Sequence, residues 1–196
     1  AGMLVHRGKI DNMNHLIDVT PLPDWTLLLS KLMALLKMQA LLLLVIMIGG
    51  MTIQIYNGYY NFEIGHYLYE LYVLNFIGFV IWAFLSLFIQ ILIGNPYLGL
   101  FVMLVISIGL PFLSFAGIEQ AIFKYNQAPG FQYSDMNSYG SSLSPYIIHR
   151  LYWFLGGLAL LCLSALFWVR GLPHSFKERI LIAKSRFKGF LLIGLS

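Results

Sequence analysis

Charge is scarce in this chain: Asp, Glu, Lys and Arg together make up only 10% of its 196 residues. A soluble globular domain carries about a quarter. Hydrophobic residues make up 59%, and the mean hydropathy is +0.78. One small core cannot bury so much apolar surface. The composition therefore excludes an ordinary soluble domain and predicts an all-α integral membrane protein.

Other absences limit the chemistry. The single cysteine, Cys162, can form no internal disulfide. The sequence contains neither an HExxH motif nor a Walker A motif, so neither zinc-peptidase chemistry nor ATP hydrolysis can reside in these residues. The net charge of +4 comes from basic residues at the ends of apolar runs, which is typical of membrane topology and not of nucleic-acid binding. We expect no enzyme, cofactor or metal site here.

Four apolar runs are long enough to cross a bilayer, which takes about 20 residues. The second and third form one uncharged stretch that Gly94-Asn95-Pro96 divides, because Asn and Pro stop one helix and start the next. The sequence predicts four transmembrane helices at about 32–55, 71–93, 97–117 and 151–169.

The basic residues predict the orientation of these spans. With both ends of the segment in the cytoplasm, ten of the twelve Lys and Arg residues lie on that side, and only Lys124 and Arg150 lie on the other. The ten are Arg7, Lys9, Lys31, Lys37, Arg170, Lys177, Arg179, Lys184, Arg186 and Lys188. The outer segments are then 56–70 and 118–150, and both are rich in tyrosine.

An amphipathic stretch precedes the first span within the lead-in 1–31. Four apolar residues recur at helical spacing on one face: Ile10, Met13, Leu16 and Ile17. Asp18 and other polar residues lie opposite, so the helix is expected to lie along the cytoplasmic headgroups or against another protein. An ordinary juxtamembrane helix also fits this pattern.

Two prolines, Pro21 and Pro23, then break that helix, and Asp24 is well placed to cap a new one. A surface helix is thus joined by a rigid elbow to a membrane helix. Pushing the first is expected to tilt the second.

The amphipathic helix, the ThrPro-x-Pro elbow at Thr20–Pro23 and LeuLeuLeuSerLys at 27–31 resemble ABC-2 type exporter permeases. The resemblance implies that Lys9–Thr20 is the coupling helix that docks on a separate ABC ATP-binding subunit. It also implies that the four spans are the third to sixth of the permease, in a bacterial inner membrane. A second permease unit or a homodimer partner would complete the path.

A narrower resemblance involves PheGlnTyrSerAspMetAsnSerTyrGly at 131–140, with LeuTyrTrp at 151–153 and TrpValArgGly at 168–171. These stretches are similar to a bacterial subgroup in which the permease precedes a zinc aminopeptidase domain. The alternative function is therefore a membrane anchor for a fused aminopeptidase without active transport. An assembly scaffold is a third, weaker possibility.

Polar residues of the outer segments are further candidates. Glu63, His66 and Glu70 would share a helical face, but their boundary position favours a solvated surface over a metal site. Glu119 and Gln120 end the third span, and either cap it or belong to an outer gate in which Ala121–Phe123 forms a short re-entrant helix; the family resemblance implies such a gate. Asp135 and Asn137 lie in a loop where a structural turn is favoured over ligand contact.

The chain closes with a basic amphipathic stretch at 170–188, expected on the cytoplasmic side. The apolar residues 189–196 that follow resemble the start of a further span. This pattern predicts an excerpt from a longer protein.

Overall fold

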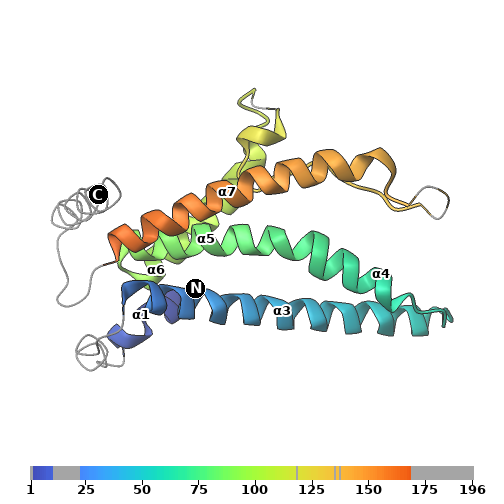
Figure 1. Ribbon diagram of the computed structural model, residues 1–196, viewed down its shortest axis with the longest axis horizontal. Coiled ribbons are helices and arrows are strands. Elements are labelled where there is room, and N and C mark those ends of the chain that lie inside the picture. Colours follow the sequence, from blue (N-terminus) through green and yellow to red (C-terminus); the bar gives the residue numbers. More distant parts are fainter. Residues whose placement is uncertain (1, 11–22, 118, 135, 137, 169–196) are drawn as a thin grey trace, which may run out of the picture. The chain divides into compact units, whose positions relative to one another are not determined.

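The computed structural model describes residues 2–10, 23–117, 119–134, 136 and 138–168, and these residues are mostly helical (Figure 1). Within them the only strand-like pairing is an isolated bridge between Ser134 and Ser138. The helices are α1 (Gly2–Ile10), α3 (Asp24–Tyr56), α4 (Ile64–Leu68), the π-helix η1 (Tyr69–Asn75), α5 (Phe76–Ile93), α6 (Pro96–Phe112), the 3₁₀ helices η2 (Ala121–Phe123) and η3 (Gly140–Ser142), and α7 (Leu143–Phe167).

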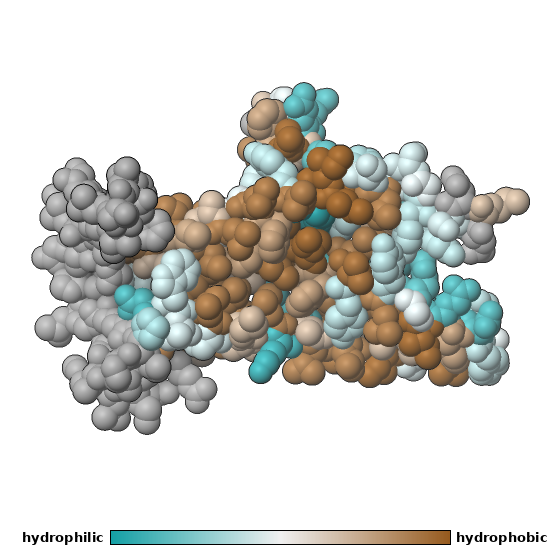
Figure 2. Space-filling model, in the orientation of Figure 1, coloured by the Kyte–Doolittle hydropathy of each residue, from teal (hydrophilic) through white to brown (hydrophobic). Residues whose placement is uncertain are grey.

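Three helical stretches of the described chain are long and apolar enough to cross a membrane: Asp24–Tyr56, Ile64–Ile93 and Gly140–Phe167. Their outward surfaces carry large hydrophobic residues, and Figure 2 shows hydrophobic residues over much of the visible face. In α3 only 11% of the most apolar stretch is buried. Such helices are suited to lipid, because lipid tails solvate apolar side chains that water does not.

The predicted third span is shorter as a helix than expected. We expected 97–117, but α6 ends at Phe112 after 17 residues. Pro111 lies in its last turn and has no N–H to donate, which weakens the α-helical pattern. Residues 113–117 continue as successive turns with bonds from each N–H to the carbonyl three residues back, such as Gly117 N to Ser114 O at 3.2 Å. Three spans are supported by length, and the fourth stays a prediction.

The division between α5 and α6 follows the predicted triplet. Gly94 has φ +72°, a left-handed conformation that glycine adopts without steric cost and that ends α5. The Asn95 side-chain oxygen accepts hydrogen bonds from Tyr97 N at 3.0 Å and Leu98 N at 3.4 Å, which caps α6. Pro96 occupies the first turn, where its missing N–H costs nothing.

The helix α3 begins at Asp24, the residue that the sequence predicts as its cap. Thr26 donates from its backbone N–H, at 3.1 Å, and from its hydroxyl, at 2.7 Å, to the carbonyl of Pro23. The second span starts earlier than expected, because α4 and η1 extend α5 back to Ile64.

The chain divides into two compact units. The first unit holds the described residues within 1–32, 84–108 and 158–168; the second holds those within 33–83 and 109–157. Leu28, Phe84 and Leu87 are buried in the first, and Leu43, Ile81 and Tyr146 in the second.

Candidate functional site

The connection between α6 and α7, residues 113–142, folds back onto α5 within the second unit. The Tyr125 hydroxyl donates to the carbonyl of Ile81 at 2.7 Å. The side-chain amide of Asn126 donates to the carbonyl of Gly78 at 3.0 Å. Asn126 has φ +59°, a left-handed conformation that Asn tolerates better than most residues. Two consecutive residues are therefore fixed to neighbouring turns of one helix.

Aromatic rings hold Tyr125 in place. Its ring meets Trp82 of α5 edge-on, with centroids 5.6 Å apart, and Trp153 of α7 at 4.9 Å. Edge-to-face pairs of this kind each stabilise a fold by about 1 kcal/mol beyond the area they bury. The docked tyrosine thus links two helices of the second unit.

Arg150 of α7 completes the attachment. Its Nη1 donates to the backbone carbonyl of Asn126 at 3.0 Å and to the Asn126 side-chain oxygen. The guanidinium carbon lies 5.0 Å from the centre of the Tyr146 ring, a favourable cation–π arrangement. A Cβ atom on Gly78 would lie 3.0 Å from Nη1. A glycine is therefore needed at position 78 for Arg150 to approach α5 in its present position.

Lys124 is the most buried cation at this docking site, with 4% of its surface exposed. Its Nζ donates a hydrogen bond to the hydroxyl of Ser114 at 2.5 Å, and Ser114 lies in the turns that follow α6. Among the residues that the structure describes, no carboxylate lies within 4.0 Å of either Lys124 or Arg150. Both basic side chains therefore lack an acidic partner among the described residues.

The depth of this attachment along α5 is informative. Ile81 lies twelve residues before Ile93, where α5 ends. A helix rises about 1.5 Å per residue, which places Ile81 roughly 18 Å from that end. Ile81 therefore lies near the middle of the 30-residue helical stretch Ile64–Ile93. Polar side chains that pack against the middle of an apolar helix need protein partners, and the Tyr125 hydroxyl and the Asn126 amide have them.

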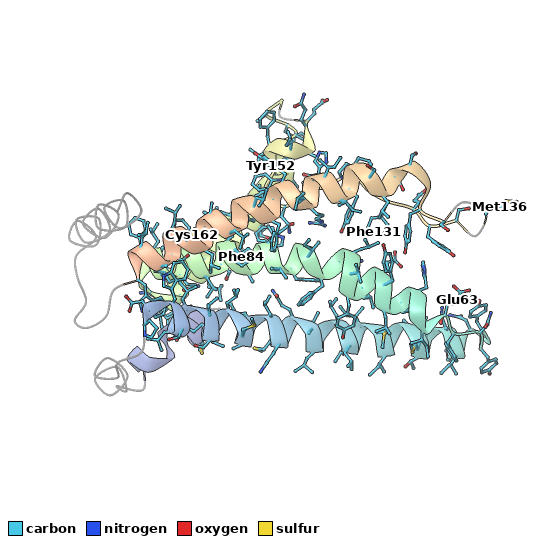
Figure 3. All side chains as sticks on the ribbon, viewed as in Figure 1. Glu63, Phe84, Phe131, Met136, Tyr152 and Cys162 are labelled. Atoms are coloured by element: carbon cyan, nitrogen blue, oxygen red, sulfur yellow. The ribbon has the colours of Figure 1, made fainter. Side chains whose placement is uncertain are left out.

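A second cluster of rings packs nearer the start of α4. His66 lies 4.1 Å from Tyr133 and 5.9 Å from Tyr139, measured between ring centroids. Phe131 packs edge-on between Tyr139 and Tyr146, and Figure 3 shows it on the α6–α7 connection. These rings fasten the connection to the beginning of the second long helix.

The hydroxyl of Tyr139 is buried and has no hydrogen-bond partner in the described part of the chain. Burial, with the neighbouring Glu70 carboxylate as the next cause, raises the pKa of Tyr139 above its ordinary value. Tyr146 differs, because its buried hydroxyl donates to the carbonyl of Leu74 at 2.8 Å. The two tyrosines are thus a matched pair, one satisfied and one not.

Tyr139→Phe is expected to stabilise the protein by about 1 kcal/mol, because it removes an unpartnered buried hydroxyl. Tyr146→Phe is expected to destabilise it by about 1 kcal/mol, because it leaves the Leu74 carbonyl without that donor. The raised pKa means that the folded state disfavours ionised Tyr139, so the protein loses stability as the pH rises above about 10, and Tyr139→Phe should reduce this alkaline destabilisation. Equilibrium unfolding in mixed detergent micelles measures both; a loss of stability in Tyr139→Phe would contradict the assignment.

A separate cluster lies in the first unit, around Gln90. The side chain of Gln90 is 2% exposed and its Oε1 has no partner. The buried His6 of α1 has its Nε2 3.1 Å from the Gln90 carbonyl. A Cβ on Gly99 would lie 2.5 Å from Gln90 Oε1, and one on Gly2 would lie 2.9 Å from Gln90 Nε2. Two glycines therefore allow α1 and α6 to approach this glutamine.

Lys31 of α3 also holds α1, which the sequence reasoning did not predict as a helix. Its Nζ donates to the carbonyls of Leu4 and Val5 at 2.9 and 2.8 Å. The same Nζ lies 5.6 Å from the centre of the Trp168 ring. We expected Lys31 to hold the cytoplasmic side of the span; in the structure it also attaches the lead-in to α3.

The predicted coupling residues mostly lie outside the described residues. Met13, Leu16, Ile17, Asp18 and Pro21 are in this group. Ile10 is the last residue of α1, and Pro23 is exposed directly before α3. The coupling helix therefore stays a prediction.

The predicted outer gate is only partly described. Glu119 and Gln120 are both exposed, while Asp135 and Asn137 lie outside the described residues. The short helix expected at Ala121–Phe123 is present as η2. The polar residues that dock are Lys124, Tyr125 and Asn126, just after it.

The sequence did not predict the contacts of Lys124, Tyr125 and Asn126, although the distribution of charge contained one signal. Lys124 and Arg150 were the two cations that broke the charge bias, and both belong to the docking site. His66 Nε2 and Glu70 Oε2 are 3.7 Å apart, and no group of three metal-ligating side chains occurs in the described part. Glu63 is exposed at the start of α4 (Figure 3).

No family model, no curated protein and no solved structure matches this chain.

Proposed function

We propose that this chain is the permease portion of an ATP-driven exporter of the ABC-2 type in a bacterial inner membrane. The observation that carries the proposal is the α6–α7 connection, whose Tyr125 reaches the carbonyl of Ile81 near mid-span. A polar segment that turns back into the bundle and is held there closes a path between helices. The permease resemblance implies such a closing segment between the fifth and sixth spans.

The proposal requires four crossings. The 17 residues of α6 rise about 26 Å, and the turns at 113–117 lengthen the element further. That length supports a crossing of a core about 30 Å thick. With α6 as a crossing, the two ends of the segment lie on the same side, as the charge bias predicts.

Transmission from the ATP-binding subunit begins at the coupling residues, Ile10, Met13, Leu16, Ile17 and Asp18. The elbow at Pro21 and Pro23 passes the movement to α3. Within the first unit, α1 is bonded to Lys31 of α3 and to Gln90 of α5. A movement of the lead-in therefore moves two long helices together. The complete exporter is a homodimer or contains a second permease unit.

The test compares two substitutions on opposite faces of the coupling helix in the full-length protein. Leu16→Glu places a charge on the apolar face and is expected to reduce permease-stimulated ATP hydrolysis at least tenfold. Asn14→Glu places the same charge on the polar face and is expected to change it less than twofold. Proteoliposomes containing equal amounts of each variant and its ATP-binding subunit provide the measurement.

Topology supplies an independent result. In a Cys162→Ser background, His15→Cys should resist a membrane-impermeant maleimide in intact cells and react after permeabilisation. Labelling from outside would overturn the proposal. Equal ATP hydrolysis in both Glu variants, together with full activity of a fused aminopeptidase, would favour the alternative of a membrane anchor.

A further inference from the structure

The starting observation is the uncompensated charge at the docking site. Arg150 bonds neutral oxygens of Asn126, and Lys124 of the same connecting segment is buried and bonds the Ser114 hydroxyl. A buried charge without an opposite charge costs several kcal/mol unless a partner offsets it. Cations within membrane-spanning regions generally have a partner or a ligand.

Unused hydrogen-bond donors lie at the same place. Arg150 Nε and Trp153 Nε1 are both buried, and neither has a hydrogen-bond partner among the residues that the structure describes. They are three residues apart on α7, so their side chains share a face of the helix. Buried donors are nearly always satisfied in folded proteins, so two neighbouring exceptions indicate a missing acceptor.

The remaining guanidinium edge has the geometry for an oxyanion. Asn126 occupies Nη1, whereas Nε and Nη2 make no hydrogen bond with the described residues. Nε and Nη2 form one fork of parallel donors, which matches two oxygens of a phosphate or carboxylate. The Trp153 N–H adds a third donor from the same face.

We propose that Arg150 and Trp153 form a binding site for a phosphate group. The phosphate belongs either to an anionic lipid headgroup or to a soluble phosphate. The site is inferred from the unpaired donors and charges alone, and does not depend on the exporter proposal. Its occupation would hold the α6–α7 connection in the docked position, because the anion contacts Arg150, which in turn holds Asn126.

The experiment measures thermal unfolding of the full-length protein in a neutral detergent. Phosphatidylglycerol, phosphatidylcholine, inorganic phosphate and chloride at matched ionic strength are titrated separately. The proposal expects a saturable increase in Tm with phosphatidylglycerol or with inorganic phosphate, and none with chloride. An increase with phosphatidylglycerol alone identifies a lipid headgroup, and one with inorganic phosphate identifies a soluble ligand.

Two variants test the assigned donors. Trp153→Phe removes the unpartnered N–H and is expected to weaken the apparent affinity about tenfold. Arg150→Lys keeps the charge but removes the fork, and is expected to weaken it at least tenfold. Trp82→Phe makes the same change in the other tryptophan that packs against Tyr125, and so controls for lost ring packing. Lys37 is exposed, and Lys37→Gln controls for the loss of a positive charge elsewhere.

Both controls should retain the wild-type affinity even if Trp82→Phe lowers the Tm of the ligand-free protein. Equal affinity in the wild type and in Trp153→Phe would overturn the proposal. Stabilisation that is the same with phosphatidylcholine, chloride and phosphatidylglycerol would overturn it as well.

Discussion

Tyr125→Ala is expected to destabilise the protein by about 3 kcal/mol, the largest effect of any single truncation in the α6–α7 connection. The change removes ring contacts with Trp82 and Trp153 and the hydrogen bond to the carbonyl of Ile81. It also leaves that carbonyl without its side-chain donor. Tyr125→Phe keeps the rings and loses only the hydrogen bond, so it should cost about 1 kcal/mol.

Unfolding in mixed micelles with a rising fraction of sodium dodecyl sulfate measures both variants. Tyr60→Ala is the matched control, because Tyr60 lies in the other connecting segment and is 70% exposed. It should change the stability by no more than about 0.5 kcal/mol. If Tyr125→Ala behaves like Tyr60→Ala, the connection is not docked on α5.

Gly99→Leu is expected to destabilise the protein by about 2 kcal/mol through overpacking in the first unit. Its Cβ would lie 2.5 to 2.8 Å from three side-chain atoms of Gln90. A long side chain normally swings away from such a clash. Gln90 has little room to do so, because it is 2% exposed and the close approach of Gly2 limits it on another side.

The same micelle assay provides two controls for this prediction. Gly109→Leu makes the identical change in α6 at a position with no neighbouring atom within 4 Å. It should be neutral or stabilising by up to about 1 kcal/mol, because leucine favours a helix more than glycine does. In the double variant, Gln90→Ala should restore at least half of the stability lost in Gly99→Leu; no recovery would show that Gln90 is not the obstacle.

Local signals in the sequence predicted local features well. The start of α3 at Asp24, the division at Gly94–Pro96 and the short helix at Ala121–Phe123 all lie at or next to their predicted positions. Capping residues, prolines and left-handed glycines act on the backbone within a few residues of themselves. The earlier start of the second long helix at Ile64 was missed, because the polar residues there resemble a loop.

The residues that make the contacts were not predicted. The sequence favours Glu119 and Gln120 as the polar residues of the outer segment, whereas Lys124, Tyr125 and Asn126 make the contacts. No local sequence feature distinguishes Glu119–Gln120 from Lys124–Asn126. Both are polar stretches beside the short apolar run 121–123, and either is compatible with a gate.

By itself the sequence determined that the described chain is helical and suited to lipid, since hydropathy and helix punctuation are properties of short stretches. Only the tertiary structure decided which polar groups meet. Asn126 and Gly78 are 48 residues apart, and Arg150 and Asn126 are 24 apart. Such pairs depend on how long apolar helices pack, and many packings satisfy the same pattern of apolar residues. The sequence alone therefore did not predict the contacts of Tyr125 or the lack of acidic partners for Lys124 and Arg150.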